Sequence, residues 1–523
     1  MAQNARVELI QSLYKAVGGI ADHHDSKTVE ALHIETPVEQ FIRDRALNGA
    51  IVFITGNPGD GKTHLLRRME AVFRAARVNV CLDANERTED ELITLIDQTM
   101  RRKTGAVLAI NEGTLVDLLR AAEGLKWVGE LKEQLLQPLA YEPQGSRSHV
   151  DAKATSSRLL VVDLNLRNNL ARETVSKALR RHLELCGPCN GCPIATCGGQ
   201  RNAGRLGNSE VAERLVTLLD AVGRGGFHAT MRDLHGLLSF MLFTGADCAA
   251  IKEGAPPIPY WDAAFEGGAG PLFDALRTLD PRLHATPLLD DELWRDADSA
   301  SDWVLPFSDE DSGAGSLDDR RERFVSRKRR AFFEHAKGAS FLPEAGTQEE
   351  KLFRTLIEGK STAVALVRLL NKFFDRDEKS GDVLYLWTTH RYDARPNRYA
   401  ASSLTIPASS LEIAIPHLRG NLAEAFPDYR PDHVVLRARG SAPSEGLRID
   451  RALVFALLEA EKGLPASFRG GEPEARLAAF YDRLARRAQP EAASDNVEVR
   501  FVDMDTGQNI QLRVDVASRR YEG

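Results

Sequence analysis

The sequence has few cysteines, no long apolar run and no strong excess of one charge. Its 523 residues include 6 cysteines and carry a formal net charge of −7. No stretch approaches the ~18 consecutive apolar residues of a membrane-spanning helix. The opening residues lack the basic start and apolar block of an export signal. We therefore expect a cytoplasmic protein without a membrane segment.

The overall composition is that of an ordinary globular protein. Hydrophobic residues make up 43% of the chain and charged residues 27%. At this length about two to four domains are expected. A net negative charge argues against attraction of the whole surface to nucleic acid, although it leaves room for a local basic patch.

Short apolar runs alternate with helical patterns over the first third of the chain. This alternation predicts an α/β region with a parallel sheet that is covered on both faces. Two helices are predicted before it, one from the apolar spacing between Val7 and Val17 and one that begins near Pro37. The strand-like runs are IVFIT (51–55), VNVCL (78–82), AVLAI (106–110) and RLLVVDL (158–164).

Composition and pattern divide the remaining chain as well. Residues 200–250 read as helices, 308–319 (SDEDSGAGSLDD) as a linker, and the last 170 or so residues as a mixture of helices and strands. The predicted parts are an N-terminal helical segment (1–36), the α/β core (37–185), a cysteine cluster with a helical lid (186–255), a connecting region with an acidic linker (256–319) and an α+β interaction region (320–523).

Residues 56–63, GNPGDGKT, match the phosphate-binding pattern G-x-x-x-x-G-K-[ST]. They lie between a predicted strand and a predicted helix, which is the context that the pattern requires. Lys62 would neutralise the β and γ phosphates of ATP, and Thr63 would place its hydroxyl on Mg²⁺. The alternative is a glycine-rich turn that binds nothing. The predicted nucleotide-binding residues are Gly56, Asn57, Pro58, Gly59, Asp60, Gly61, Lys62, Thr63 and His64.

Three predicted strand ends carry polar side chains that could complete such a site: Asp83 with Glu86, Asn111 with Glu112, and Asp163 with Asn165. Asp83 comes only 21 residues after Lys62, which we interpret as a strand directly beside the first one. We therefore expect Glu112 to polarise the attacking water.

In this interpretation Asn111 occupies the metal-facing position, where an aspartate is usual, and this weakens the expected hold on the metal. Asn165 would sense the γ-phosphate, and Asp163 is the alternative for completing the magnesium site. For each of these residues the alternative role is to cap a helix or form a turn.

With these motifs, residues 40–250 resemble the AAA+ ATPases. The resemblance implies a P-loop NTPase sheet with a helical lid, ATP hydrolysis and assembly into an oligomer. It also implies a sensor arginine on a lid helix, for which Arg232 is the match. An arginine finger that acts on the nucleotide of a neighbouring subunit would be Arg167 or Arg172. The alternative for each arginine is a solvated surface group.

A looser resemblance involves AINEG (109–113), VVDLNLR (161–167), YWDAAFEGGAGPLFDALRTLDP (260–281) and the cysteine cluster. These segments look like ATPase subunits of prokaryotic DNA restriction and phage-defence systems, in particular the system that acts on phosphorothioated DNA. This resemblance implies other protein subunits as partners, with DNA as a further candidate.

Four of the six cysteines lie close together: Cys186, Cys189, Cys192 and Cys197. Four thiolates on a turn-rich segment favour a tetrahedral Zn²⁺ site. The spacing is also near that of a ferredoxin run, so an iron–sulfur cluster is the alternative, although the last gap is one residue longer. Four free buried cysteines remain the third interpretation.

A basic segment follows the acidic linker, on a predicted helix that also bears Phe324, Phe332 and Phe333. It could grip a phosphate backbone. We prefer a helix whose phenylalanines enter the core and whose charges answer the acidic stretch before it. The basic residues are Arg320, Arg321, Arg323, Arg327, Lys328, Arg329 and Arg330.

These observations support three hypotheses. The first is an ATPase whose nucleotide state controls assembly with partner proteins. The second, motivated by Asn111, is a nucleotide-binding scaffold or switch with little hydrolysis. The third is a DNA-stimulated motor with an iron–sulfur element.

Overall fold

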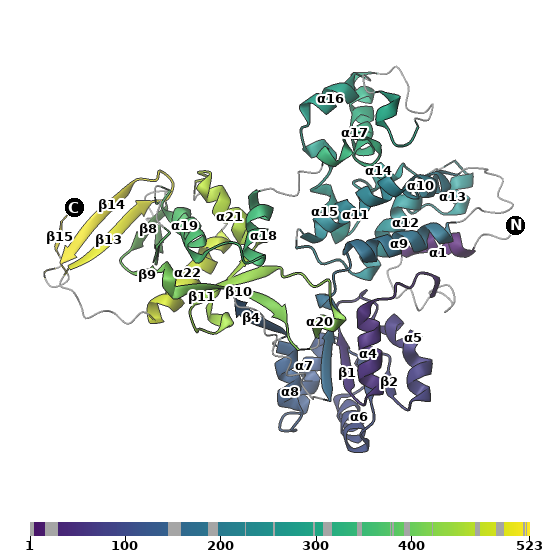
Figure 1. The fold of residues 1–523 in the computed structure, drawn as a ribbon, viewed down its shortest axis with the longest axis horizontal. Helices are drawn as coiled ribbons and strands as arrows, with labels where there is room; N and C mark the ends of the chain where they lie inside the picture. The colour runs from purple at the N-terminus through teal and green to yellow at the C-terminus, as the bar shows by residue number, and fades with distance from the viewer. Residues whose placement is uncertain are drawn as a thin grey trace. The chain divides into compact units, whose positions relative to one another are not determined.

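The computed structural model forms two compact units, shown in Figure 1. Unit 1 comprises Met1–Pro138, Ala152–Ala345 and Gly420–Arg430, and unit 2 comprises Leu139–Asp151, Gly346–Arg419 and Pro431–Gly523. The residues that the structure describes are 5–15, 30–136, 138–144, 158–186, 197–224, 226–254, 257–295, 299–306, 316–341, 348–376, 378, 381–391, 398–420, 422–465, 471–487, 496–515, 518 and 520–522. The predicted linker at 308–319 lies mostly outside them.

Unit 1 contains a four-stranded parallel sheet in the order β2-β3-β1-β5. Ile51 of the central strand β1 pairs with Ala106 of β3 on one side and with Leu159 of β5 on the other. The predicted parallel sheet is confirmed. Its strands are β1 (Ile51–Thr55), β2 (Asn79–Cys81), β3 (Ala106–Ala109) and β5 (Leu159–Asp163).

Helices cover both faces of this sheet, as Figure 1 shows. The core on one face joins strand residues such as Phe53 and Leu108 to Ile96 of α6 and Leu118 of α7. Pro37 occupies the first turn of α4, where a missing N–H costs nothing. The covering helices are α4 (Pro37–Leu47), α5 (Lys62–Ala75), α6 (Glu89–Arg102), α7 (Glu112–Ala121) and α8 (Val128–Leu136).

The second part of unit 1 is a helical core around α12 (Met231–Phe243). Every residue of α12 from 234 to 243 is buried. The N-terminal helix α1 (Ala5–Lys15) packs against it, and the predicted helices over 200–250 are confirmed. The other helices of this core are α9 (Arg172–Leu185), α10 (Gly198–Leu206), α11 (Ser209–Arg224), α13 (Cys248–Lys252), α14 (Tyr260–Ala263), α15 (Pro271–Arg277), α16 (Pro287–Trp294) and α17 (Leu317–Glu334).

One helical stretch of the described residues, Met231–Lys252, is long and apolar enough to cross a membrane. It consists largely of α12, whose apolar side chains pack inside the helical core of unit 1. A buried core helix passes the same length and composition test.

Helix α17 contains all seven residues of the basic segment and belongs to unit 1, so the predicted boundary at residue 320 is wrong. Phe332 and Phe333 are buried in the helical core. Arg329 is 2% exposed and donates to Asp262 and Asp280. The buried phenylalanines and the ion pairs of Arg329 therefore connect α17 to the helices before it. The linker-like composition of residues 308–319 gave no sign of this connection.

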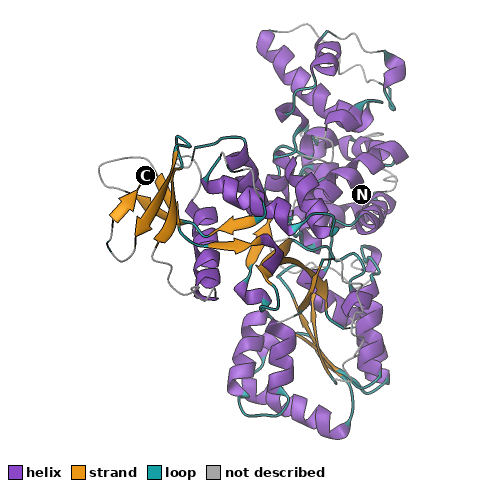
Figure 2. Cartoon of the chain, turned by 60° about the vertical axis from the view of Figure 1, so that its left-hand side comes forward, coloured by secondary structure: helices purple, strands orange, loops and turns teal. Residues whose placement is uncertain are grey.

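Unit 2 combines helices with antiparallel strands, as expected for an α+β region (Figure 2). One sheet has the order β12-β11-β10-β4 and another β15-β14-β13-β8-β7. The strands are β4 (Leu139–Pro143), β6 (Val383–Tyr385), β7 (Thr388–Arg391), β8 (Arg398–Ser402), β9 (Thr405–Pro407), β10 (Leu411–Leu418), β11 (His433–Ala438), β12 (Leu447–Asp450), β13 (Asn496–Asp503), β14 (Asn509–Asp515) and β15 (Arg520–Glu522). The helices are α18 (Gln348–Ile357), α19 (Ala363–Phe374), α21 (Arg451–Glu461) and α22 (Gly471–Arg487).

Two short segments belong to a different unit from their neighbours in the chain. Strand β4 follows α8 of unit 1 but pairs with β10 of unit 2, with Leu139 opposite Leu418. Helix α20 (Leu422–Ala425) follows β10 but contacts α4 of unit 1. The predicted core of 37–185 therefore includes a strand of unit 2, because sequence continuity does not fix sheet membership.

Candidate functional site

Residues 56–63, which we call the glycine loop, lead from the end of β1 into the first turn of α5. Gly56, Gly59 and Gly61 have φ angles of 138°, 106° and 88°, which L side chains rarely adopt. At Gly59 a Cβ would also lie 3.1 Å from Cβ of Arg232. Helix α5 begins at Lys62, so its positive N-terminal end faces the loop. Such a loop suits a bound anion.

The glycine loop lines a cavity of about 310 Å³. The volume is in the range of small-molecule sites. The segments that follow β1, β2, β3 and β5 line this cavity, together with the first residues of α12. The lining residues outside 57–65 are Leu32, His33, Ile34, Thr36, Leu82, Asp83, Asn85, Ala109, Asn111, Arg167, Met231, Arg232 and His235.

Lys62 lies within the glycine loop. Its Nζ donates to the carbonyl oxygens of Gly56 at 2.6 Å and Asn57 at 3.2 Å. Burial lowers the pKa of Lys62, and nearby carboxylates oppose this change. An ammonium group so placed can pair with an anion in the cavity. The opposing carboxylates are Asp60, Asp163, Asp83 and Glu112.

The strand order corrects the interpretation of Asp83. Strand β3 lies between β1 and β2, so β2 is not beside β1. Helix α5 has 14 residues, about 21 Å of length, whereas adjacent strands are about 4.8 Å apart. A single helix can therefore carry the chain past one strand position. Asp83 and Asn111 both line the cavity.

Glu112 and Asn165 lie together beside the glycine loop. Asn165 Nδ2 donates to Glu112 Oε1 at 3.1 Å, and its Oδ1 accepts from the Asn57 N–H at 3.3 Å. Glu112 is not itself among the residues that line the cavity within the described chain. Asn111 precedes α7 without a side-chain cap bond, so the capping alternative does not occupy its amide.

Asp163 ends β5 and caps the following turn, accepting from the Asn165 N–H at 3.0 Å. The turn-forming alternative therefore applies to this residue. Burial raises the pKa of Asp163, and the charges of Glu112 and Asp60 add to the effect. A cation near these carboxylates would relieve the repulsion between them.

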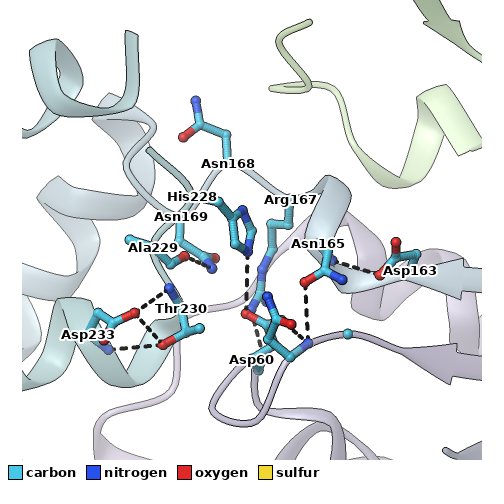
Figure 3. Close-up of polar contacts among 12 residues, drawn as sticks. Asp60, Asp163, Asn165, Arg167, Asn168, Asn169, His228, Ala229, Thr230 and Asp233 are labelled. Carbon is cyan, nitrogen blue, oxygen red and sulfur yellow. Dashed lines mark hydrogen bonds and ion pairs between the residues drawn. The ribbon is translucent and has the colours of Figure 1, made fainter. Parts of the chain in front are cut away.

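The cavity contains two arginines in addition to Lys62. Arg232 is the second residue of α12, and its N–H donates to Gly59 O at 3.2 Å. Arg167 donates from Nη2 to Asp60 O at 2.7 Å, as Figure 3 shows. Arg167 lines the cavity of its own chain, and an action on the nucleotide of a neighbouring subunit stays a prediction. Arg172 instead forms a surface ion pair with Glu213.

Three histidines line the cavity, His33, His64 and His235, and only His64 was predicted. His33 Nδ1 is 3.1 Å from His64 Nε2, and His33 Nε2 is 2.9 Å from Glu39 Oε2. Burial lowers the pKa of His64 to about 4 and also lowers that of His235. No local pattern marks His33 or His235, because they reach the cavity only through the fold.

The predicted cysteine site lies partly outside the described residues. Buried Cys186 follows α9 and Cys197 precedes α10, whereas Cys189 and Cys192 fall in the segment that the structure does not describe. Among the described residues, no group of three or more His, Cys, Asp or Glu could hold a metal ion. That search covers only half of the predicted thiolates.

Comparisons with models of protein families, with curated proteins and with solved structures found no match.

Proposed function

We propose that the chain binds ATP with Mg²⁺ at the glycine loop and hydrolyses it as a P-loop ATPase of the AAA+ type. The observation that carries this proposal is a glycine loop at the N-terminus of α5 that lines a cavity with Lys62, Arg167 and Arg232. Three cations and a helix N-terminus suit a triphosphate. The parallel sheet with a neighbouring helical core is consistent with this class.

Residues of the cavity also suit a magnesium ion. Thr63 of the glycine loop and Asp83, which follows β2, both line the cavity and would supply oxygen ligands. Mg²⁺ typically uses one or two protein ligands together with substrate phosphates and water. When bound, the ion would neutralise charge on the β and γ phosphates. Asp163, at the end of β5, remains the alternative ligand.

The hydrolytic step needs an oriented water and stabilised phosphate charge. In this proposal Glu112 accepts a hydrogen bond from the water and Asn165 holds Glu112 in place, as their 3.1 Å contact allows. Lys62 and Arg232 stabilise the charge on the transferred phosphoryl group.

We further propose that the nucleotide state controls assembly with partner proteins in the cytoplasm, as an oligomer or in a multi-protein complex. DNA restriction or phage defence is the biological role that the sequence resemblance favours. A switch with little hydrolysis is the second candidate, because the residue that follows β3 and lines the cavity is Asn111 rather than a carboxylate.

Measurements of ATP binding and steady-state hydrolysis test the proposal. Lys62→Ala should abolish binding, and Glu112→Gln should keep binding but slow turnover by about 100-fold or more. Lys103→Ala, which changes an exposed lysine after α6, is the matched control and should behave as wild type. Tight binding without turnover in the wild type would favour the switch, and no binding would contradict both candidates.

For the cysteine cluster we propose a structural Zn²⁺ site held by Cys186, Cys189, Cys192 and Cys197. Buried Cys186 and partly buried Cys197 lie at the ends of two helices that flank the segment. Metal analysis of the purified protein should find one zinc per chain in a colourless sample. Iron, sulfide and a brown colour would instead support the iron–sulfur alternative and the DNA-stimulated motor.

A further inference from the structure

The glycine loop contains a buried carboxylate, Asp60, which is 1% exposed (Figure 3). Its Oδ2 accepts from the Asn57 N–H at 2.7 Å and so shapes the loop. Its Oδ1 is buried and has no hydrogen-bond partner among the described residues. A negative charge within an anion-binding loop opposes phosphate binding unless nearby cations compensate for it.

Two groups from separate segments approach Asp60. Arg167, after β5, donates from Nη2 to the backbone oxygen of Asp60 at 2.7 Å. His228, before α12, places Nε2 3.8 Å from Asp60 Oδ1. His228 Nε2 also lacks a hydrogen-bond partner in the described chain. Two unsatisfied atoms thus face each other about 1 Å beyond hydrogen-bond distance.

The segment that carries His228 is firmly connected to α12. Asn169 Nδ2 donates to Ala229 O at 2.7 Å, and Thr230 caps α12 together with Asp233. The Arg232 N–H reaches Gly59 O of the glycine loop. Because α12 is buried from residue 234 to residue 243, a shift of this segment would move packed side chains rather than a free loop.

We propose that Arg167, Asp60 and His228 form a relay that reports the terminal phosphate of the bound nucleotide to α12 of the same chain. The proposal rests on the proposed function, because the relay needs a nucleotide in the cavity. A terminal phosphate offers Arg167 a charged, bidentate acceptor in place of the single Asp60 carbonyl. Arg167 then contacts the phosphate and releases Asp60.

Arg167 holds the backbone oxygen of Asp60 and does not contact its Oδ1. Once Arg167 leaves, the backbone at Asp60 can move, and Oδ1 can then accept a hydrogen bond from His228 Nε2–H. The two atoms need to approach by about 1 Å, and this approach draws the start of α12 toward the glycine loop. No proton is transferred in this exchange of hydrogen bonds. ADP has no terminal γ-phosphate, so Arg167 stays on Asp60 and α12 keeps its position.

A purely structural role for Arg167 predicts something different. If Arg167 only pins the glycine loop, its loss weakens ATP and ADP binding equally. The ratio of the two affinities therefore separates the roles, and the response of α12 supplies a second readout that a structural role would not move.

The test measures the affinities of the full chain for ADP and for a non-hydrolysable ATP analogue with Mg²⁺ by calorimetry. Hydrogen exchange of residues 227–243 is followed with each nucleotide. Arg167→Gln should lose about tenfold in affinity for the ATP analogue relative to ADP, the effect of one charge-assisted hydrogen bond. Arg181→Ala, which changes an exposed arginine of α9 that pairs with Glu184, is the control.

The other end of the relay is tested independently. His228→Ala and Asp60→Asn should each remove the ATP-specific protection of residues 227–243. His228→Ala should retain the preference for the ATP analogue, because it leaves Arg167 in place. These two variants keep the relay testable if Arg167→Gln does not fold.

Equal loss of both nucleotides in Arg167→Gln, or full ATP-specific protection in His228→Ala, would overturn the relay. Wild-type protein that binds both nucleotides with identical protection of α12 would also overturn it, while the proposed function would stand. Wild-type protein that binds neither nucleotide would remove both.

Discussion

Arginine residues have two distinct roles in unit 1. Arg167 and Arg232 line the cavity, whereas Arg329 is enclosed by acidic side chains. Arg329 lies on the same helix as Arg321, and the sequence does not distinguish them. In the structure Arg329 is 2% exposed and Arg321 is 66% exposed. Their partners, rather than their local sequence, separate a buried ion pair from a solvated charge.

The cluster around Arg329 gives a stability prediction. Arg329→Met should leave Asp280, which is 1% exposed, and Asp262 with less compensating charge, and so destabilise unit 1 by about 3 kcal/mol. Arg321→Ala removes only an exposed pair with Asp318 and should cost under about 1 kcal/mol. Denaturant unfolding followed by circular dichroism measures both. Equal effects of the two substitutions would contradict the buried role.

At the scale of helices and strands, local patterns predicted most elements correctly. The runs that became β1 and β5, and Pro37 at the start of α4, were recognisable because apolar spacing and proline act locally. The strand order β2-β3-β1-β5 could not be predicted from the sequence. A crossover helix can place the next strand directly beside the previous one or leave room for another strand between them. The error about Asp83 follows from this difference.

The missed strand β4 shows the same limit. Its sequence, LAYEP, has partly exposed residues and ends in Pro143, so it lacks a clear strand pattern. Proline at the end of an edge strand loses no ladder hydrogen bond to a second neighbour. Its pairing partner β10 lies far along the chain, with Pro143 opposite Ala414. Only the fold brings these segments together.

The candidate site divides in a similar way. The glycine loop was predicted because the pattern is continuous in sequence, and Arg232 because of the family resemblance. His33, His228 and the turn of Arg167 toward Asp60 depend on contacts between distant segments. Asp60 itself was predicted as one of the nucleotide-binding residues of the loop, but its burial and its partners appear only in the folded chain.

At the scale of the whole molecule, the two units are interleaved along the chain. Leu139–Asp151 leaves unit 1 to join unit 2, and Gly420–Arg430 does the reverse. The second segment supplies α20 against α4 and an ion pair of 2.9 Å between Arg430 and Asp220. Neither unit therefore consists of one continuous stretch, and both need the chain on each side of their boundaries.

This organisation predicts how a fragment of residues 1–345 should behave. The fragment keeps β4 but lacks β10, so the backbone groups of β4 that pair in the full chain become available to other molecules. We expect it to aggregate on size-exclusion chromatography. Replacing 139–151 with a glycine–serine linker of the same length should restore a monomer, because the unpaired strand is gone.

The repaired fragment should still melt below the full chain in a thermal shift assay. It lacks Glu424, which pairs with Arg45 at 3.4 Å, and Arg430, which pairs with Asp220. Exposed ion pairs contribute little to stability, so most of the lost stability should come from the missing packing of α20 on α4. Adding a separate peptide of residues 420–430 should recover part of the lost stability. A 1–345 fragment that is monomeric with β4 present, and that melts with the full chain, would contradict the interleaved organisation.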